Sequence, residues 1–213
     1  MKKFAIAGAA ALATVGAASA DFSGVSVMSM GEILPGTVTY RVMADFTSPE
    51  DSVLAVSASQ TALRWSGATL VQDSPGFETL DLQDRPFVAS GPGDSWVTIG
   101  GNVDAGTTDT TFSPGFLSPA FPGASVINGS FFEQLENGGY FDFDPGTAEN
   151  GGSVIIAQFT IAAGDVGTYE GTVDWQGAGA GFISDVFSVT VPAPGAMALL
   201  GLAGLAGSRR RRG

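Results

Sequence analysis

Carboxylates are the most plentiful reactive side chains in this 213-residue chain, and their chemistry is either acid–base catalysis or cation binding. The chain has 21 acidic residues but no His and no Cys. Ser–His–Asp catalysis, His-bound metals, thiol nucleophiles, thiolate clusters and disulfides are therefore excluded. The hydrolytic mechanism that this composition permits is that of a glycosidase, which places two carboxylates about 5 to 10 Å apart.

Two acidic pairs could serve such a mechanism, Glu133 with Glu136 and Asp142 with Asp144. No surrounding motif selects either pair, and a chain so rich in acidic residues contains close pairs by chance. We therefore expect a protein that is not an enzyme, and we keep a two-carboxylate glycosidase as the less favoured alternative.

Calcium is the cation that suits such oxygen-rich segments, because hard cations prefer carboxylate and carbonyl ligands. Asp142 and Asp144 alternate along the chain, and Glu149 follows them. The segment is not an EF-hand loop, since its sixth position is Thr147 where that loop requires Gly. We take Asp142, Asp144 and Glu149 as a candidate calcium site, with solvated turn residues as the alternative. A second oxygen-rich segment contains Asn102, Asp104 and Asp109.

Aromatic side chains could bind sugar rings by stacking. The candidates are Trp65, Trp96, Trp175, Tyr140 and Phe141. Trp65 and Trp175 lie on the apolar faces of predicted strands, so we expect them in the core. Tyr140 follows the polar, glycine-rich residues 137–139, and we expect it to be exposed and to face a ligand. No organic cofactor is expected.

The charge of the chain is divided between two basic ends and an acidic body. The net charge is −12, but six of the nine basic residues lie at the ends, and all the acidic ones lie between Asp21 and Asp185. Between these two residues the three basic side chains are Arg41, Arg64 and Arg85, which leaves the body at −18. Nucleic acid is not expected as a partner, because its phosphates require clustered Lys and Arg.

Residues 1–20 have the three-part order of a secretory signal peptide. Two lysines precede an uncharged apolar run over residues 4–18, and the small residues Ala18 and Ala20 stand where signal peptidase reads. Asp21 would begin the mature chain. We expect export through the Sec machinery, and the run of about 15 apolar residues is too short for a permanent span, which needs about 20.

Residues 192–213 form a second apolar segment with a basic end. Pro192 and Pro194 follow Val191 and separate it from a Gly/Ala/Leu run over residues 196–207. Proline stops a helix from extending backward, so this run is expected to form its own short helix. Four arginines follow it and favour the cytoplasmic side of a membrane. They are Arg209, Arg210, Arg211 and Arg212.

The order Val-Pro-x-Pro, short apolar helix and arginine cluster resembles the PEP-CTERM sorting signal of Gram-negative and related bacteria. Ala193 stands where that family has its central Glu. The resemblance implies an exosortase-like membrane enzyme that cuts near Pro192–Pro194 and passes the protein to the cell surface or extracellular matrix, often beside exopolysaccharide. A retained membrane anchor is the alternative. The resemblance covers about 22 residues and implies nothing about the fold before them.

The fold must come from residues 21–191, where alternating apolar residues predict strands. In residues 38–46 the even positions are apolar and face inward, while Thr39, Arg41 and Asp45 face water. In residues 53–58 we expect Leu54 and Val56 to face inward. Further strands are predicted at 62–65, 96–99, 154–161, 171–175 and 182–191, and residues 100–150 are expected to hold irregular loops or a β-flap.

These strands, the 31 glycines and the many Pro-Gly turns predict an all-β domain. We expect a single antiparallel β-sandwich of about eight strands, of jelly-roll or immunoglobulin type. The texture of residues 37–59, 96–100 and 154–161 is also similar to exported cohesin-like domains, which implies a binding or scaffold role. The expected order is thus a signal peptide (1–20), an acidic sandwich (21–191) and a sorting tail (192–213). A carbohydrate-binding module is the leading alternative role, with extracellular polysaccharide as its partner.

Overall fold

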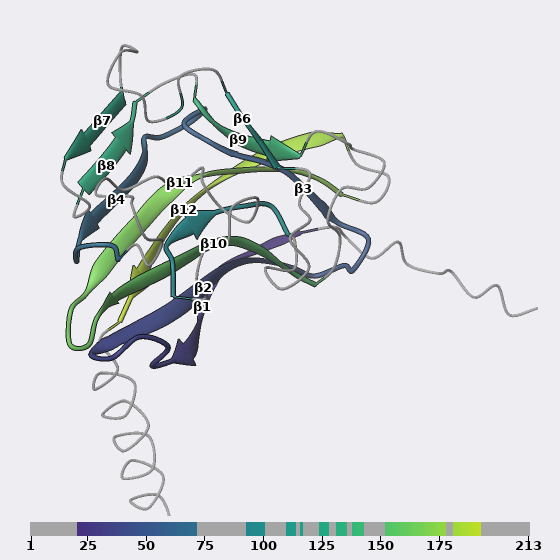
Figure 1. Cartoon of the computed structure of the whole chain (residues 1–213). Helices are drawn as coiled ribbons and strands as arrows, with labels where there is room; N and C mark the ends of the chain where they lie inside the picture. The colour runs from purple at the N-terminus through teal and green to yellow at the C-terminus, as the bar shows by residue number, and fades with distance from the viewer. Residues whose placement is uncertain are drawn as a thin grey trace, which may run out of the picture.

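The computed structural model describes residues 21–71, 93–100, 110–113, 116, 124–127, 131–135, 138–142, 152–177 and 181–192. These residues form no helix and build two antiparallel sheets that pack face to face, as predicted for a β-sandwich (Figure 1). They contain twelve strands where the sequence predicted about eight, because residues 22–31 form a strand that was not predicted and short strands occupy the region expected to be irregular.

The small sheet has the order β1-β2-β10-β5. Its strands are β1 (Phe22–Gly31), β2 (Thr37–Phe46), β10 (Ser153–Ala162) and β5 (Trp96–Val97). The large sheet has the order β6-β9-β3-β11-β4-β8-β7, with β12 paired to β11. Its strands are β3 (Ser52–Ser57), β4 (Leu63–Gly67), β6 (Thr110–Phe112), β7 (Ala124–Ile127), β8 (Phe131–Gln134), β9 (Gly139–Asp142), β11 (Gly167–Gln176) and β12 (Phe182–Val191).

The large sheet is forked at β11. One edge of β11 pairs with β12 over all ten of its residues. The other edge pairs first with β4, over residues 167–170, and then with β3, over residues 172–176. The first arm continues from β4 to β8 and β7, and the second from β3 to β9 and β6 (Figure 1). Residues 58–62, which join β3 to β4, lie where the two arms diverge.

The alternation predicted for β2 is confirmed on its inner face. Val38, Tyr40, Val42, Ala44 and Phe46 are all buried. The outer face is drier than predicted, because Thr39 is also buried, and its hydroxyl lies 2.7 Å from that of Thr160 on β10. This bond gives each of the two buried hydroxyls a protein partner on the neighbouring strand.

The prediction for β3 was wrong at one position. Val53 and Val56 are fully buried, whereas Leu54 is only half-buried. The cause is a bulge: Trp175 pairs with Val53 and Asp174 pairs with Ala55, so Leu54 has no partner on β11. An extra residue reverses the in–out alternation on one side of it.

Aromatic rings connect the two sheets through the middle of the core. Trp65 on β4 lies 4.6 Å from Phe159 on β10, measured between ring centroids. Phe159 then contacts Tyr169 on β11 at 5.0 Å, and Tyr169 contacts Phe187 on β12 at 5.2 Å. The last two contacts are edge-to-face, which is a favoured geometry for aromatic pairs.

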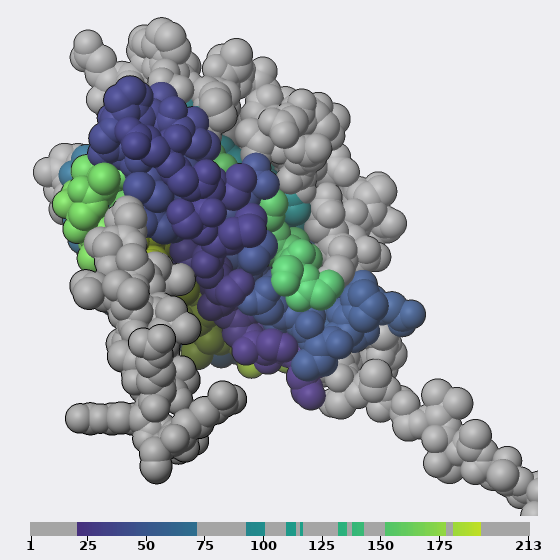
Figure 2. All heavy atoms as spheres, turned by 90° about the horizontal axis from the view of Figure 1, so that it is seen from below, coloured from purple at the N-terminus to yellow at the C-terminus, as the bar shows by residue number. Residues whose placement is uncertain are grey.

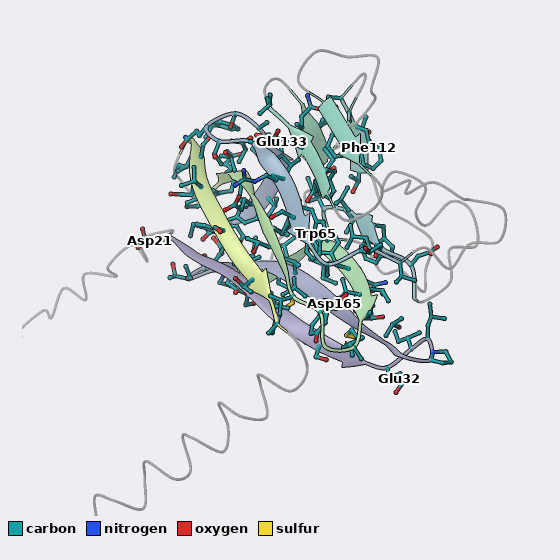
Figure 3. The ribbon with its side chains drawn as sticks, turned by 90° about the vertical axis from the view of Figure 1, so that its left-hand side faces the viewer. Asp21, Glu32, Trp65, Phe112, Glu133 and Asp165 are labelled. Atoms are coloured by element: carbon teal, nitrogen blue, oxygen red, sulfur yellow. The ribbon has the colours of Figure 1, made fainter. Side chains whose placement is uncertain are left out.

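The described chain begins and ends at opposite poles of the sandwich. Asp21 is tied to Thr47, just beyond the end of β2, and Figure 3 shows it far from Glu32 and Asp165. Val191 pairs with Gly167 beside the Asp165 turn. The ten residues of β2 span about 33 Å, which sets the separation of the poles.

Seen from the side opposite the fork, β1 and the residues next to it lie across the surface (Figure 2).

Candidate functional site

A cleft of about 290 Å³ lies on the second arm of the large sheet, where the arm leaves β11. The described residues that line it belong to β3, to β9 and the residue before it, to β11, to the 58–62 loop and to the residue after β6. They are Ala55, Ser57, Ser59, Ser113, Gly138, Gly139, Tyr140, Phe141 and Asp174. This size is close to the lower end of ligand pockets, which begin at about 300 Å³.

Asp174 is the carboxylate among these lining residues, and it is held by three serine hydroxyls. The hydroxyl of Ser57 donates to Oδ2 at 2.6 Å, while Ser184 and Ser59 donate to Oδ1 at 2.5 and 3.4 Å. Asp174 is 5% exposed, so its carboxylate lies at the base of the cleft. Alternation along β11 places it there, because its neighbours Val173 and Trp175 face the core.

The serine hydroxyls give their protons to the protein and leave lone pairs at the cleft. A hydroxyl has one proton to donate and two lone pairs. Ser57 and Ser59 donate to Asp174, and Ser113 donates to the carbonyl oxygen of Gly139 at 3.1 Å. Ser57 and Ser113 also each accept one backbone N–H, from Ser59 at 3.3 Å and from Gly139 at 3.0 Å, so each keeps one lone pair. An ionised carboxylate has about four acceptor positions, of which three on Asp174 are occupied. The cleft therefore presents acceptors and favours a ligand that donates hydrogen bonds.

Backbone contacts hold the walls of the cleft together. The N–H of Ala58 donates to the carbonyl oxygen of Gly138 at 2.9 Å, and the N–H of Gln60 donates to the hydroxyl of Thr172 at 3.2 Å. Gly139 brings β9 against β3, since a Cβ at this position would lie 2.3 Å from the carbonyl oxygen of Val56. The shape of the cleft thus depends on a close approach of two backbones.

An ion pair lies on the other arm, away from the cleft. The guanidinium of Arg64 on β4 donates hydrogen bonds to the carboxylate of Glu170 on β11. Its Nη1 lies 3.8 Å from Oε1 of Glu133 on β8. The hydrogen bond from Arg64 lowers the pKa of Glu170, burial raises it by less, and a bond from Ser188 adds to the lowering. Arg64 faces Glu170, about 13 Å along β11 from Asp174. Its charge therefore serves the ion pair rather than the cleft.

The aromatic residues have different positions from those predicted. Tyr140 was expected to be exposed, and this was wrong: it is fully buried, and its hydroxyl donates to the carbonyl oxygen of Ile156 on β10 at 2.7 Å. Trp65 and Trp175 are in the core, as predicted, and Trp96 is buried too. Phe141, the next residue after Tyr140, faces outward and lines the cleft.

The acidic candidates are only partly within the described residues. Asp142 ends β9 and pairs with Thr110, while Asp144 and Glu149 lie outside the described part, as do Asn102, Asp104 and Asp109. Of the other proposed pair, Glu133 is near Arg64 and Glu136 lies outside. Within the described ranges, no group of three or more acidic side chains is arranged to hold a metal ion.

The residues predicted to act in signal-peptide cleavage and sorting lie next to the two poles of the described structure where they fall within it. Asp21 is exposed, and Thr47 bonds to both its backbone N–H and its carbonyl oxygen, at 3.1 and 3.0 Å. Val191 is buried at the end of β12, and Pro192 follows it half-buried. Ala18, Ala20, Ala193, Pro194 and the four arginines at 209–212 lie outside the described residues. No helix in the described ranges has the length and apolar character to cross a membrane.

Asp174 and its serines were missed by the sequence analysis. The signal that could have found them is the polar face of β11, where Thr168, Glu170, Thr172 and Asp174 alternate with core residues. Asp174 differs from the other three in receiving three serine hydroxyls, from its partner Ser184 on β12, from Ser57 on β3 and from Ser59 in the loop after β3. That property depends on strand pairing, which the sequence alone does not supply.

Comparison with protein-family models, curated proteins and solved structures finds no match to this chain.

Proposed function

We propose that the chain is an exported protein that reaches the cell surface or extracellular matrix through its sorting tail, and that residues 21–191 serve there as a non-catalytic structural or binding domain. The Sec machinery and signal peptidase would remove residues 1–20, and an exosortase-like enzyme would act near residues 192–194. The short apolar helix would hold the protein in the membrane until then. The sandwich would be of the jelly-roll or immunoglobulin/cohesin-like kind.

The placement of the cleft relative to Pro192 supports this proposal. Pro192 follows Val191, which pairs with Gly167 at one pole. Asp174 is seven residues farther along β11, which is about 23 Å toward the other pole. A membrane attachment at Pro192 would therefore leave the cleft away from the membrane surface, where a partner in the matrix can reach it.

A carbohydrate-binding module is the second candidate, and the cleft is the observation that favours it. A glycosidase is supported less, because among the described residues that line the cleft Asp174 is the one carboxylate, and serines already hold it. General acid–base cleavage of a glycosidic bond needs two carboxylates with different pKa values. The fixed carboxylate is better suited to orienting a ligand than to transferring protons.

The intact mass of the protein recovered from the surface of its producing cells tests the proposal. We expect a chain that begins at Asp21 and lacks the four arginines 209–212. A double variant, Pro192→Ala with Pro194→Ala, should accumulate as the unprocessed precursor, whereas Pro49→Ala in the turn after β2 should be processed normally. A surface-bound protein whose mass still includes the arginines would contradict processing, and a mass that includes residues 1–20 would contradict export.

A further inference from the structure

We propose that the cleft on the second arm binds an uncharged sugar residue, which donates hydroxyl protons to Asp174 and the nearby serine oxygens while one face of its ring lies on Phe141. The inference rests on the proposed function, because it names the ligand class of the domain that the tail delivers. It uses contacts within the sandwich and does not depend on how the tail is processed.

The direction of the hydrogen bonds indicates the ligand class. Ser57, Ser59 and Ser113 each donate their proton inside the protein, so these side chains can only accept from a ligand. On Asp174, Oδ1 accepts two bonds and Oδ2 accepts one, which leaves an acceptor position on Oδ2. A ligand with several hydroxyl donors complements this set, in which Asp174 is buried, Ser57 and Ser113 are half-buried and Ser59 is exposed.

The apolar wall of the cleft suits the C–H face of a sugar ring. Phe141 and Ala55 pair across β9 and β3, and both line the cleft beside the polar groups. Phe141 is half-buried, so one part of its ring is supported by the protein while another faces the cleft. Ligand sites combine such apolar surfaces with a few fixed polar groups that orient the ligand. The volume of about 290 Å³ is small for a drug-sized molecule and fits one ring of a longer chain.

Charge argues against an acidic sugar or another anion. Asp174 carries the charge at the cleft, and the described lining residues include no basic side chain to offset it. The body of the protein carries −18, which repels anions at longer range. A uronate or sulfated sugar would therefore meet unfavourable charge both at the site and on the way to it.

A hard cation is also a poorer occupant than a sugar. Calcium takes six to eight oxygen ligands, usually with several carboxylates. Here serine hydroxyls take three of the positions on Asp174, the one carboxylate among the described residues that line the cleft, and Phe141 and Ala55 form an apolar wall. A cation would have to displace these serine bonds, whereas a hydroxyl donor can bind beside them.

The acceptor set is fixed before the ligand arrives. Residues 58–62 are bonded through Ala58 to Gly138, the residue before β9, and through Gln60 to β11. A 3.2 Å bond from the Gln60 side chain to the carbonyl oxygen of Ser184 joins them to β12. Ordering a loop upon binding costs free energy, and here that cost is met during folding. Preorganisation helps a small site to bind a single ring.

Binding of neutral, anionic and cationic glycans to the protein as recovered from its producing cells tests the inference. The probes are oligosaccharides of glucose, mannose and galactose as neutral sugars, oligogalacturonate as an anion and oligoglucosamine as a cation. Each is titrated by calorimetry, with and without EDTA. The variants are Asp174→Asn, which keeps the size of the side chain, Phe141→Ala, and Phe182→Ala as a matched control. Phe182 is 66% exposed on β12 and does not line the cleft.

We expect at least one neutral oligosaccharide to bind, with EDTA causing no change. Asp174→Asn and Phe141→Ala should each weaken binding at least tenfold, and Phe182→Ala less than twofold. Thermal unfolding checks that each variant is folded. If either cleft variant is not folded, Ser59→Ala tests the same site. The Ser59 hydroxyl makes a single 3.4 Å side-chain contact, so we expect this variant to fold, and it should weaken binding measurably.

Four results would overturn the inference: no neutral probe binds, folded cleft variants bind like the wild type, only oligoglucosamine or oligogalacturonate binds, or EDTA abolishes binding. These results are distinct from a failure of the proposed function. Glycan binding by a protein that keeps residues 1–20 would contradict export and leave the cleft assignment standing. An exported, processed protein that binds no glycan would contradict the cleft assignment and leave the proposed function standing.

Discussion

Tyr140 and Tyr169 place their hydroxyl oxygens 2.8 Å apart in the core between the sheets. Because Tyr140 donates its proton to the carbonyl oxygen of Ile156, Tyr169 must be the donor to Tyr140. Ile156 lies at a bulge in β10, where it has no partner on β2. The two tyrosines thus form a polar bridge from the large sheet to the small one, and burial raises the pKa of the Tyr169 hydroxyl.

Removing the hydroxyl of Tyr140, which bonds to both Ile156 and Tyr169, should lower the free energy of unfolding more than removing the hydroxyl of Tyr169. Tyr140→Phe leaves the buried Tyr169 hydroxyl without this acceptor, and we expect a loss of about 1 to 3 kcal/mol. Tyr169→Phe keeps the bond from Tyr140 to Ile156, and we expect about 0.5 to 1.5 kcal/mol. Urea unfolding of both variants measures the difference. Equal losses, or a larger loss for Tyr169→Phe, would contradict the assigned direction of the bonds.

The pair of Arg64 and Glu170 should make a small, pH-dependent contribution to stability. Arg64 lowers the pKa of Glu170 in the folded protein, so the pair stabilises the fold above the unfolded value of about 4.3. That contribution is lost as the pH falls through the folded pKa. Because Arg64 is 41% exposed, we expect less than about 1 kcal/mol.

Unfolding of the wild type and of Glu170→Gln at pH 7, 5 and 3 measures this effect. The wild type should be the more stable at pH 7, and the difference should shrink toward pH 3. In an Arg64→Met background the same substitution should give a much smaller change with pH. An undiminished pH dependence in that background would assign the effect to another partner.

The close approach of β9 to β3 should make Gly139 sensitive to substitution. In Gly139→Ala the new Cβ would lie 2.3 Å from the carbonyl oxygen of Val56 and 2.8 Å from the Cα of Ser57, so a backbone must move. We expect a loss of about 1 to 3 kcal/mol, as for other overpacked sites. Gly181→Ala is the matched control, since its Cβ would meet nothing within 4 Å. Urea unfolding should show little change for the control, and similar losses in both variants would argue against close packing at Gly139.

The charge of the body predicts that divalent cations hold the protein in an anionic matrix. A body of −18 repels acidic polysaccharide and lipid unless cations bridge them. Washing producing cells with EDTA should release surface-bound protein, whereas EDTA already saturated with calcium should not. The amount released is measured by immunoblotting. Equal retention after both washes would contradict bridging.

Local patterns were enough to predict three of the four sheet-forming stretches of ten residues that follow β1, namely β2, β10 and β12, and part of β11, but they did not predict β1 itself. The inner face of β2 and the buried Trp65 and Trp175 follow from alternation alone. Leu54 could not be placed, because its position depends on a bulge that arises from pairing with β11. Tyr140 sits among glycines and polar residues that are typical of exposed turns, yet its ring fills the space between the sheets.

The candidate site was beyond the reach of local patterns. Asp174 receives hydroxyls from Ser57 and Ser184, which are 117 and 10 residues away in sequence. Such a cluster exists only after β3 and β12 have paired with the two edges of β11. Phe141 was considered for stacking because of its residue type, but its outward direction depends on Tyr140 pointing inward.

The pairing of β12 with β11 has a mechanical consequence for a protein tethered at Pro192. β12 runs toward that pole and is bonded to β11 over ten consecutive residue pairs. A pull on the tether, resisted by a ligand held near the opposite pole, would act along the axis of β12. Such a force would load the hydrogen bonds between β11 and β12 at the same time, in shear, instead of breaking them one after another from one end. If the proposed tether at Pro192 holds, the domain would be suited to bear tension along this axis.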